Sequence, residues 1–191
     1  MIRNYIEVMS KQIFTDSDYN SNNGFSTYIW GPCAWHFLHI ITFNYPNKPT
    51  IQQQKDYYKF FKILGKVLPC KWCRINYMKN IKKMKLSLKV FKNRKTLSQW
   101  LYNMHTIIND MLDEQKNKNK QKNKTYDEVK EFYEHFRARC TKKSDIKKGQ
   151  HGGCTIPLHN GSKSKTILKI VPRNYKIESV TVNKKCLCTK K

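Results

Sequence analysis

The chain has 191 residues and a mass of 22.9 kDa, with 38 lysines and arginines against 13 acidic residues, giving a net charge of +25. This length suits one domain with its own core plus an extension, and no apolar run approaches the roughly 20 residues of a membrane-spanning helix. The charge would attract nucleic acid or acidic proteins, although lysines scattered singly beside abundant asparagine are equally typical of compositional bias.

Residues 1–27 are expected to form a mobile arm, because Asp, Asn and Ser dominate from Asp16 to Ser26. The first five residues lack the apolar core of a secretory signal, so we expect a soluble protein made in the cytosol. Seven cysteines are unusual in such a protein, since cytosolic thiols stay reduced. Either a metal binds them or the protein itself carries out thiol oxidation.

Two helices are predicted before residue 69. Gly31 and Pro32 indicate the start of the first, which Tyr45-Pro46 ends, and its apolar stripe contains Trp35, Leu38, Ile41 and Phe43. Thr50 and Gln53 form a capping box for the second. Its core positions at helical spacing are Tyr57, Phe60, Phe61, Leu64, Val67 and Leu68.

A C-x-x-C motif, Cys70 to Cys73, directly follows Pro69 and opens the third helix. At a helix start, free amides and the helix dipole favour a thiolate, and Lys71 and Arg74 add positive charge. A thiolate is the nucleophile of disulfide exchange. The motif alone fits a redox pair and half of a metal site equally well.

Two further helices follow a basic connection, residues 79–95, that is expected to be partly helical at most. Thr96 and Gln99 read as a capping box for an amphipathic fourth helix, on which His105 and Asn109 share a face. Residues 116–124 are a low-complexity run of Lys, Asn and Gln, predicted to be a solvated loop. A third capping box, Thr125 with Glu128, begins a fifth helix whose inward residues are Val129, Phe132, Tyr133 and Phe136.

Beyond residue 140 the sequence is rich in turn-forming and basic residues. Residues 166–171 and 177–182 could pair as short strands, too few for an independent core. The domains expected are therefore an arm (1–27), an all-α domain (28–140) and a basic, cysteine-containing and weakly structured C-terminal extension (141–191).

An ordered set of four motifs resembles the Erv/ALR family of FAD-linked sulfhydryl oxidases, with the members from large DNA viruses most similar in size. The motifs are Gly31-x-x-x-Trp35-x-x-x-His39, Tyr45-Pro46, Cys70-x-x-Cys73 and Trp100-Leu101-x-x-x-His105-x-x-x-Asn109. The resemblance implies a four-helix bundle plus a short fifth helix, usually a homodimer, which passes electrons from protein dithiols through the cysteine pair to FAD. Molecular oxygen then accepts them, giving hydrogen peroxide.

The resemblance also implies roles for residues. Cys73 would be the thiol beside the flavin, and Cys70 the outer thiol that exchanges with substrates. We expect the Cys73 thiolate to be favoured by the helix terminus and by the flavin itself. The cofactor-binding residues would be Gly31, Trp35, His39, Tyr77, His105, Asn109 and Tyr133. For any one of these alone, ordinary core packing is the simpler interpretation, and Tyr133 stands where the family often has Trp.

The chain departs from the family at a structural disulfide of the cellular members. Cys140 matches one partner of that disulfide, but the other falls near Tyr126, so Cys140 is free, pairs elsewhere or pairs with Cys154. Cys33 is expected to be a small buried apolar residue. Cys186 and Cys188 could act as a shuttle to substrates, with Cys154 a weaker candidate, or be incidental thiols of the tail.

Two rival hypotheses stay open. One is a zinc-binding, nucleic-acid-associated basic protein, in which Cys70 and Cys73 share the metal with two of His151, Cys154, His159, Cys186 and Cys188, although the oxidase interpretation needs no metal. The other is a purely structural basic virion protein. For an oxidase, the expected setting is the host cytoplasm or viral factory, with packaging in the virion, and the basic tail could contact nucleic acid or acidic proteins.

Overall fold

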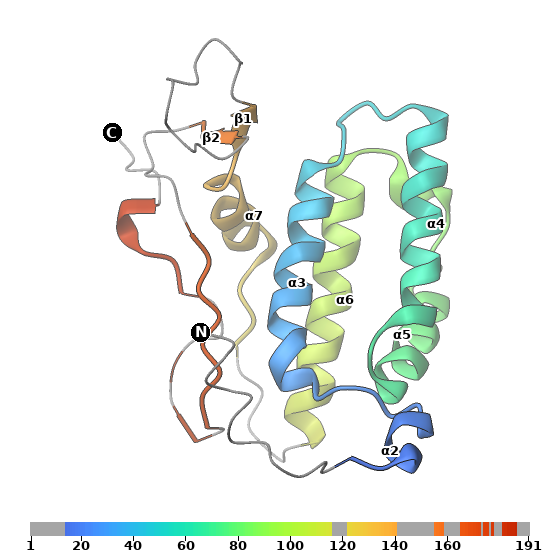
Figure 1. Cartoon of the computed structure of the whole chain (residues 1–191). Helices are drawn as coiled ribbons and strands as arrows, with labels where there is room; N and C mark the ends of the chain where they lie inside the picture. The colour runs from blue at the N-terminus through green and yellow to red at the C-terminus, as the bar shows by residue number, and fades with distance from the viewer. Residues whose placement is uncertain are drawn as a thin grey trace, which may run out of the picture.

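The computed structural model describes residues 14–115, 122–140, 155–158, 165–172, 174–175, 177 and 181–186. Its main body is a bundle of four helices, α3 (Thr27–Asn44), α4 (Ile51–Val67), α5 (Lys71–Lys83) and α6 (Arg94–Gln115). Helix α3 lies along α6, α4 packs on α5, and a fifth helix, α7 (Tyr126–Glu134), packs against α3 (Figure 1). The predicted all-α fold with a short fifth helix is confirmed.

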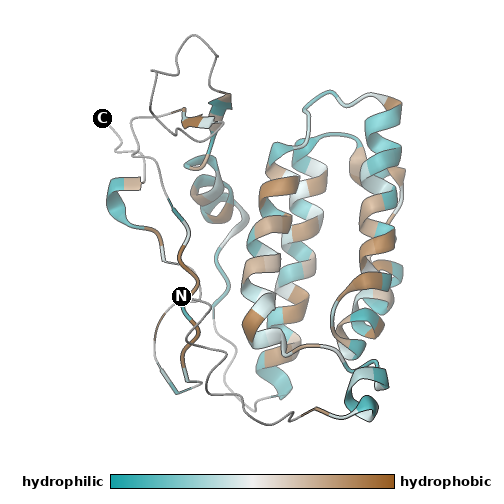
Figure 2. Ribbon diagram, viewed as in Figure 1, coloured by the Kyte–Doolittle hydropathy of each residue, from teal (hydrophilic) through white to brown (hydrophobic). Residues whose placement is uncertain are grey.

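One continuous hydrophobic core joins the four bundle helices and η1 (Leu88–Phe91). Figure 2 shows apolar and polar segments alternating along each bundle helix, as expected for amphipathic helices. Two buried tyrosines donate hydrogen bonds to backbone carbonyls across the core, Tyr45 to Phe91 and Tyr77 to Phe61, each at 2.8 Å. The core residues are Leu38, Tyr45, Phe61, Tyr77, Ile81, Phe91, Leu97, Trp100, Leu101 and Met104.

Two of the three predicted capping boxes are confirmed and one is displaced. Thr50 with Gln53 and Thr125 with Glu128 form reciprocal boxes at the starts of α4 and α7. Helix α6 instead begins at Arg94, because the Asn93 side chain accepts from the Thr96 amide (2.9 Å) while the Thr96 hydroxyl accepts from the Asn93 amide (3.1 Å). The prediction that Thr96 caps this helix was therefore wrong by three residues.

The first bundle helix starts earlier than predicted. Helix α3 begins at Thr27 and contains Gly31 and Pro32, which were expected to start it. Proline keeps a helical φ and removes one backbone hydrogen bond, a loss that is tolerated close to a helix start. The indole N–H of Trp30, in the first turn of α3, donates a hydrogen bond to the Phe25 carbonyl just before the helix, at 3.1 Å.

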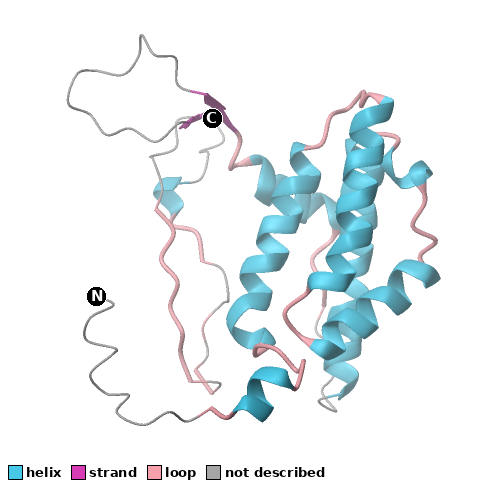
Figure 3. Cartoon of the chain, turned by 45° about the vertical axis from the view of Figure 1, so that its right-hand side comes forward, coloured by secondary structure: helices cyan, strands magenta, loops and turns pink. Residues whose placement is uncertain are grey.

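The described part of the N-terminal arm is structured. Helix α2 (Asp16–Asn20) has its own capping box at Thr15, and it lies at the end of the bundle where α3 begins (Figure 3). The loop after α2 hydrogen-bonds to the residues around Cys70. The domain boundaries themselves stay a prediction.

The C-terminal extension contributes one short strand and a turn of 3-10 helix to the described structure, and its strand pairs with the last three residues of the preceding domain. Strand β1 (Ala138–Cys140) pairs antiparallel with β2 (Thr155–Pro157), and η3 spans Lys184–Cys186. The predicted pairing of residues 166–171 with 177–182 was wrong for its described part, since residues 165–172 form no strand. Within the described residues, no helix is both long and apolar enough to cross a bilayer.

Candidate functional site

The two cysteines of the C-x-x-C motif occupy the N-terminus of α5. Cys70 is the N-cap residue, with extended backbone (φ −157°, ψ 126°), and its Sγ accepts a hydrogen bond from the Cys73 amide at 3.3 Å. Both are half-buried free thiols. Helix α5 begins at the end of the bundle where α3 starts and α6 finishes (Figure 1).

The electrostatics of the pair differ from the sequence-based expectation for Cys73. Burial, with the hydrogen bond and charge of Cys70 as further causes, raises the pKa of the Cys73 thiol to about 12, and the Arg74 guanidinium only partly opposes this. The part of the expectation that rests on the helix terminus was wrong for the protein alone, because burial outweighs the opposing effects of the helix terminus and Arg74, whereas the expected contribution of a bound flavin stays a prediction. Cys73 lies inside the first turn, where burial disfavours its charged form.

An aromatic cluster lies where α3, α6 and α7 meet. The ring of Trp35 stacks on His105 with centroids 4.1 Å apart and planes within 6°. The ring nitrogens His39 Nε2 and His105 Nδ1 lie 3.1 Å apart. The structure thus brings together three of the residues predicted to contact the flavin, from two helices.

Helix α7 closes this cluster with Tyr133. Its ring stacks on His39 (5.0 Å) and on Phe43 (5.4 Å), each within 20° of parallel, and its hydroxyl lies 3.4 Å from His36 Nδ1. The structure therefore places Tyr133 with the predicted site. His36 was not predicted to belong to the site, and Phe43 was predicted only as part of the apolar stripe. His36 lies three residues before His39, a spacing that could have revealed it.

Burial keeps the clustered histidines neutral. Desolvation lowers the pKa of His39 to about 3, with smaller contributions from His105 and His36, and lowers that of His105 to about 4. The Nδ1 atom of His39 is buried without a hydrogen-bond partner in the described protein. A flat, uncharged aromatic surface with one unpaired buried ring nitrogen suits a planar heteroaromatic ligand with polar edges, as the flavin of FAD is.

Three other predicted cofactor residues lie apart from the stacked rings. The Asn109 amide donates to Asn123 Oδ1 at 3.0 Å, which links α6 to the segment before α7. Tyr77 is a core residue whose hydroxyl is bonded to Phe61. At Gly31 an added Cβ would meet only the Thr27 Cβ, at 3.9 Å, so no described protein atom requires glycine there.

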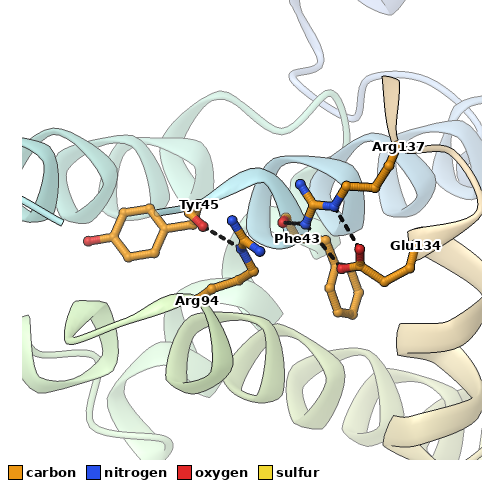
Figure 4. A network of polar contacts seen from close by, with 5 residues as sticks. All are labelled: Phe43, Tyr45, Arg94, Glu134 and Arg137. Carbon is orange, nitrogen blue, oxygen red and sulfur yellow. Dashed lines mark hydrogen bonds and ion pairs between the residues drawn. The ribbon is translucent and has the colours of Figure 1, made fainter. Parts of the chain in front are cut away.

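Two arginines hold the carboxyl end of α3 beside the cluster (Figure 4). Arg94 Nε donates to the Tyr45 carbonyl at 2.6 Å, and Arg137 donates to the Phe43 carbonyl and pairs with Glu134 at 2.6 Å. A cavity of about 800 Å³ lies nearby, lined by residues that include Phe43, Arg94 and Glu134.

The remaining cysteines are spread over the chain. Cys33 is exposed on α3, so the expectation that it is buried was wrong: the half-turn that carries Trp35 inward turns position 33 toward solvent. Cys140 is an exposed free thiol, and Cys186 is half-buried. Cys154, Cys188 and the other proposed zinc ligands His151 and His159 lie outside the described residues. In the described part of the chain, no three metal-binding side chains gather at one point.

Comparison with known proteins gives concordant matches. Residues 32–131 match the model of the Erv1 / Alr family. A probable FAD-linked sulfhydryl oxidase of Acanthamoeba polyphaga mimivirus is 38% identical over 80 residues, covering 42% of this chain and 56% of that protein. The FAD-linked sulfhydryl oxidase ERV1 of Arabidopsis thaliana is 32% identical over 82 residues, 43% of this chain and 41% of its own length.

Among solved structures, the yeast Erv1 core aligns with a TM-score of 0.48 at 22% identity, over 65% of this chain and 93% of that one. The chain spans about half the length of the curated relatives it matches. The family match contains both cysteines of the motif, the α3 ring residues and His105, whereas Gly31 and Tyr133 lie just outside it.

Proposed function

The chain belongs to the Erv1 / Alr family, and from this membership we propose that it is an FAD-linked sulfhydryl oxidase that forms disulfides in protein substrates. The observation that carries the proposal is the joint presence, within the matched residues, of a dithiol at a helix start and a neutral aromatic cluster. The first is the chemistry of disulfide exchange. The second is a suitable wall for a flavin ring.

The exchange step is assigned to Cys70. A substrate thiolate attacks the Cys70 sulfur of the oxidised pair, and Cys73 leaves as the thiolate. The second substrate thiol then displaces Cys70, so that the substrate gains one disulfide and the pair takes up two electrons and two protons. A bound FAD would supply the acceptor for these electrons and the route to molecular oxygen, with hydrogen peroxide as the product.

Residues of three helices would hold the cofactor. Trp35 and His105 offer a stacked ring surface, His39 offers its unpaired Nδ1, and Tyr133 covers them from α7. Asn109 would contribute its side-chain amide from the next turn of α6. We also assign Gly31 to this site by its position in the first family motif, and Tyr77 by the family resemblance, four residues after Cys73 on α5.

The finer assignments are part of the same proposal. We propose a homodimer, supported by Phe37 and Ile40, which are 60% and 39% exposed on α3.

Cys186 and Cys188 would relay oxidation to bulky substrates. We propose a setting in the host cytoplasm or viral factory, with packaging in the virion; what supports a viral setting is that one matched relative is a mimivirus protein. The basic tail would contact acidic proteins or nucleic acid weakly.

The purified full-length protein separates this proposal from a zinc-binding protein. An oxidase is yellow as isolated and consumes oxygen when dithiothreitol is added. A colourless protein that releases zinc to a chelator and leaves oxygen unchanged would overturn the proposal and favour the rival.

A further inference from the structure

The backbone before α5 is covered by a short segment of the N-terminal arm, residues 22–25, here called the clamp segment. The Phe25 amide donates to the Pro69 carbonyl at 2.7 Å, and the Lys71 amide donates to the Asn23 carbonyl at 3.1 Å. Gly24 forms an antiparallel bridge with Cys70 between these two bonds. Hydrogen bonds on both sides of Cys70 therefore hold it in extended conformation.

Gly24 makes this close approach sterically feasible. Its φ is +80°, a conformation that only glycine adopts readily. A Cβ at this position would lie 2.3 Å from the Pro69 carbonyl oxygen and 3.1 Å from the Cys70 Cα. Any side chain here would push the clamp segment away from the cysteine loop.

Arg74 ties the clamp segment and the cysteine loop together. Its guanidinium donates to the Leu68 carbonyl at 2.6 Å, and to both the carbonyl (2.7 Å) and the side-chain oxygen (2.6 Å) of Asn22. The planar fork of arginine reaches these acceptors on two sides simultaneously. A lysine ammonium would keep the charge but not this geometry.

These contacts determine the position of the Cys70 sulfur. Its extended backbone directs Sγ to the Cys73 amide at 3.3 Å, at the positive end of the α5 dipole. We propose that Arg74, with the clamp segment, is a positioning residue that fixes Cys70 at the N-cap of α5 and thereby sets the reactivity of its thiol toward substrates. The role of that reactivity in turnover rests on the proposed function, but the reactivity itself is measurable without turnover.

The test compares Arg74→Lys and Gly24→Ala with wild type and with Lys83→Ala, a change at an exposed position in the last turn of the same helix. In the reduced full-length protein, the iodoacetamide alkylation rate of Cys70 is followed by mass spectrometry as a function of pH. We expect both variants to alkylate Cys70 about five- to tenfold more slowly near neutral pH, with the profile moved to higher pH, because the thiolate fraction falls. Lys83→Ala should match wild type.

Two results would overturn the proposal. An Arg74→Lys profile equal to wild type would show that charge alone matters, and an unchanged Gly24→Ala profile would show that the clamp segment has no role. Gly24→Ala changes an exposed residue outside the core, so it decides the question even where Arg74→Lys loses helical content. Since alkylation requires neither flavin nor oxygen, failure of the oxidase proposal leaves this test intact.

Discussion

At the scale of residues, burial decides the protonation of the aromatic cluster. His39 and His105 have pKa values lowered to about 3 and about 4, mainly because desolvation disfavours the imidazolium form. Both rings therefore stay neutral at physiological pH, which suits stacking and hydrogen bonding with a neutral heteroaromatic ring. The unfolded chain has ordinary histidines that take up protons near pH 6.5.

This difference predicts an acid-sensitive fold. Between about pH 6.5 and about pH 4 the unfolded state binds more protons than the folded state, so the free energy of unfolding decreases as the pH falls, by up to about 1.4 kcal/mol per pH unit for each histidine. In His39→Gln, urea unfolding of the flavin-free protein should show a shallower decrease over this range. Equal slopes in wild type and variant would contradict the assignment of His39 as a buried neutral residue.

A substitution at Gly31 tests contact with the cofactor separately from packing within the protein. Among the described residues, a Cβ at this position would meet only the Thr27 Cβ, at an ordinary contact distance of 3.9 Å, and alanine is favoured over glycine inside a helix by about 1 kcal/mol. We expect Gly31→Ala to leave the flavin-free protein as stable as wild type or more so, while FAD retention on gel filtration decreases. Unchanged FAD retention would remove Gly31 from the cofactor site.

At the scale of elements, α7 completes the proposed cofactor site, since the Tyr133 ring stacks on His39 from that helix. It is held by polar contacts rather than by a disulfide between described cysteines. The Tyr126 hydroxyl bonds Ser98 on α6 at 2.8 Å, and Arg137 at the end of α7 binds the Phe43 carbonyl and Glu134. The arginine satisfies a carbonyl at the end of α3 that lacks a partner within its own helix.

Removing this contact should loosen α7. We expect Arg137→Ala to lower the free energy of unfolding by about 1–2 kcal/mol, the loss typical of a charge-assisted hydrogen bond that is partly exposed. Arg139→Ala, two residues further on the exposed strand β1, should stay within about 0.5 kcal/mol of wild type. Equal losses in the two variants, measured by urea denaturation, would show that Arg137 has no special role.

Much of this arrangement could be predicted from sequence because its signals are local. The capping boxes at Thr50 and Thr125 and the apolar spacing placed α4 and α7, and four motifs in order indicated the family. The start of α3 was missed because Gly31-Pro32 also fits the interior of a helix near its beginning. The raised pKa of Cys73 and the contacts of Arg74 could not be predicted, since they depend on burial and on a segment 52 residues away.

At the scale of the whole molecule, the family match covers residues 32–131, and the arm and the basic extension lie outside it. The described part of the extension places Cys186 half-buried beside Lys184 and Lys185, two residues before Cys188. A C-x-C disulfide closes a small strained ring, and strain makes a disulfide more oxidising. The extension would then pass oxidation outward to folded substrates.

The shuttle hypothesis makes a selective prediction. Serine at both Cys186 and Cys188 should slow the oxidation of a reduced, folded protein substrate several-fold while leaving oxygen uptake with dithiothreitol unchanged, because a small dithiol reaches Cys70 directly. The matched control is Cys140→Ser. Unchanged rates with both substrates would mean that these cysteines are not a shuttle.

Electron transfer from the cysteine pair to the cofactor is tested most directly by anaerobic reduction of the bound flavin with a dithiol. Wild-type protein mixed with dithiothreitol without oxygen should lose its yellow absorption, as electrons from Cys70 and Cys73 reach the cofactor. Cys73→Ser should keep the flavin bound and remain yellow on the same timescale. Bleaching of that variant at the wild-type rate would contradict electron transfer through this cysteine pair.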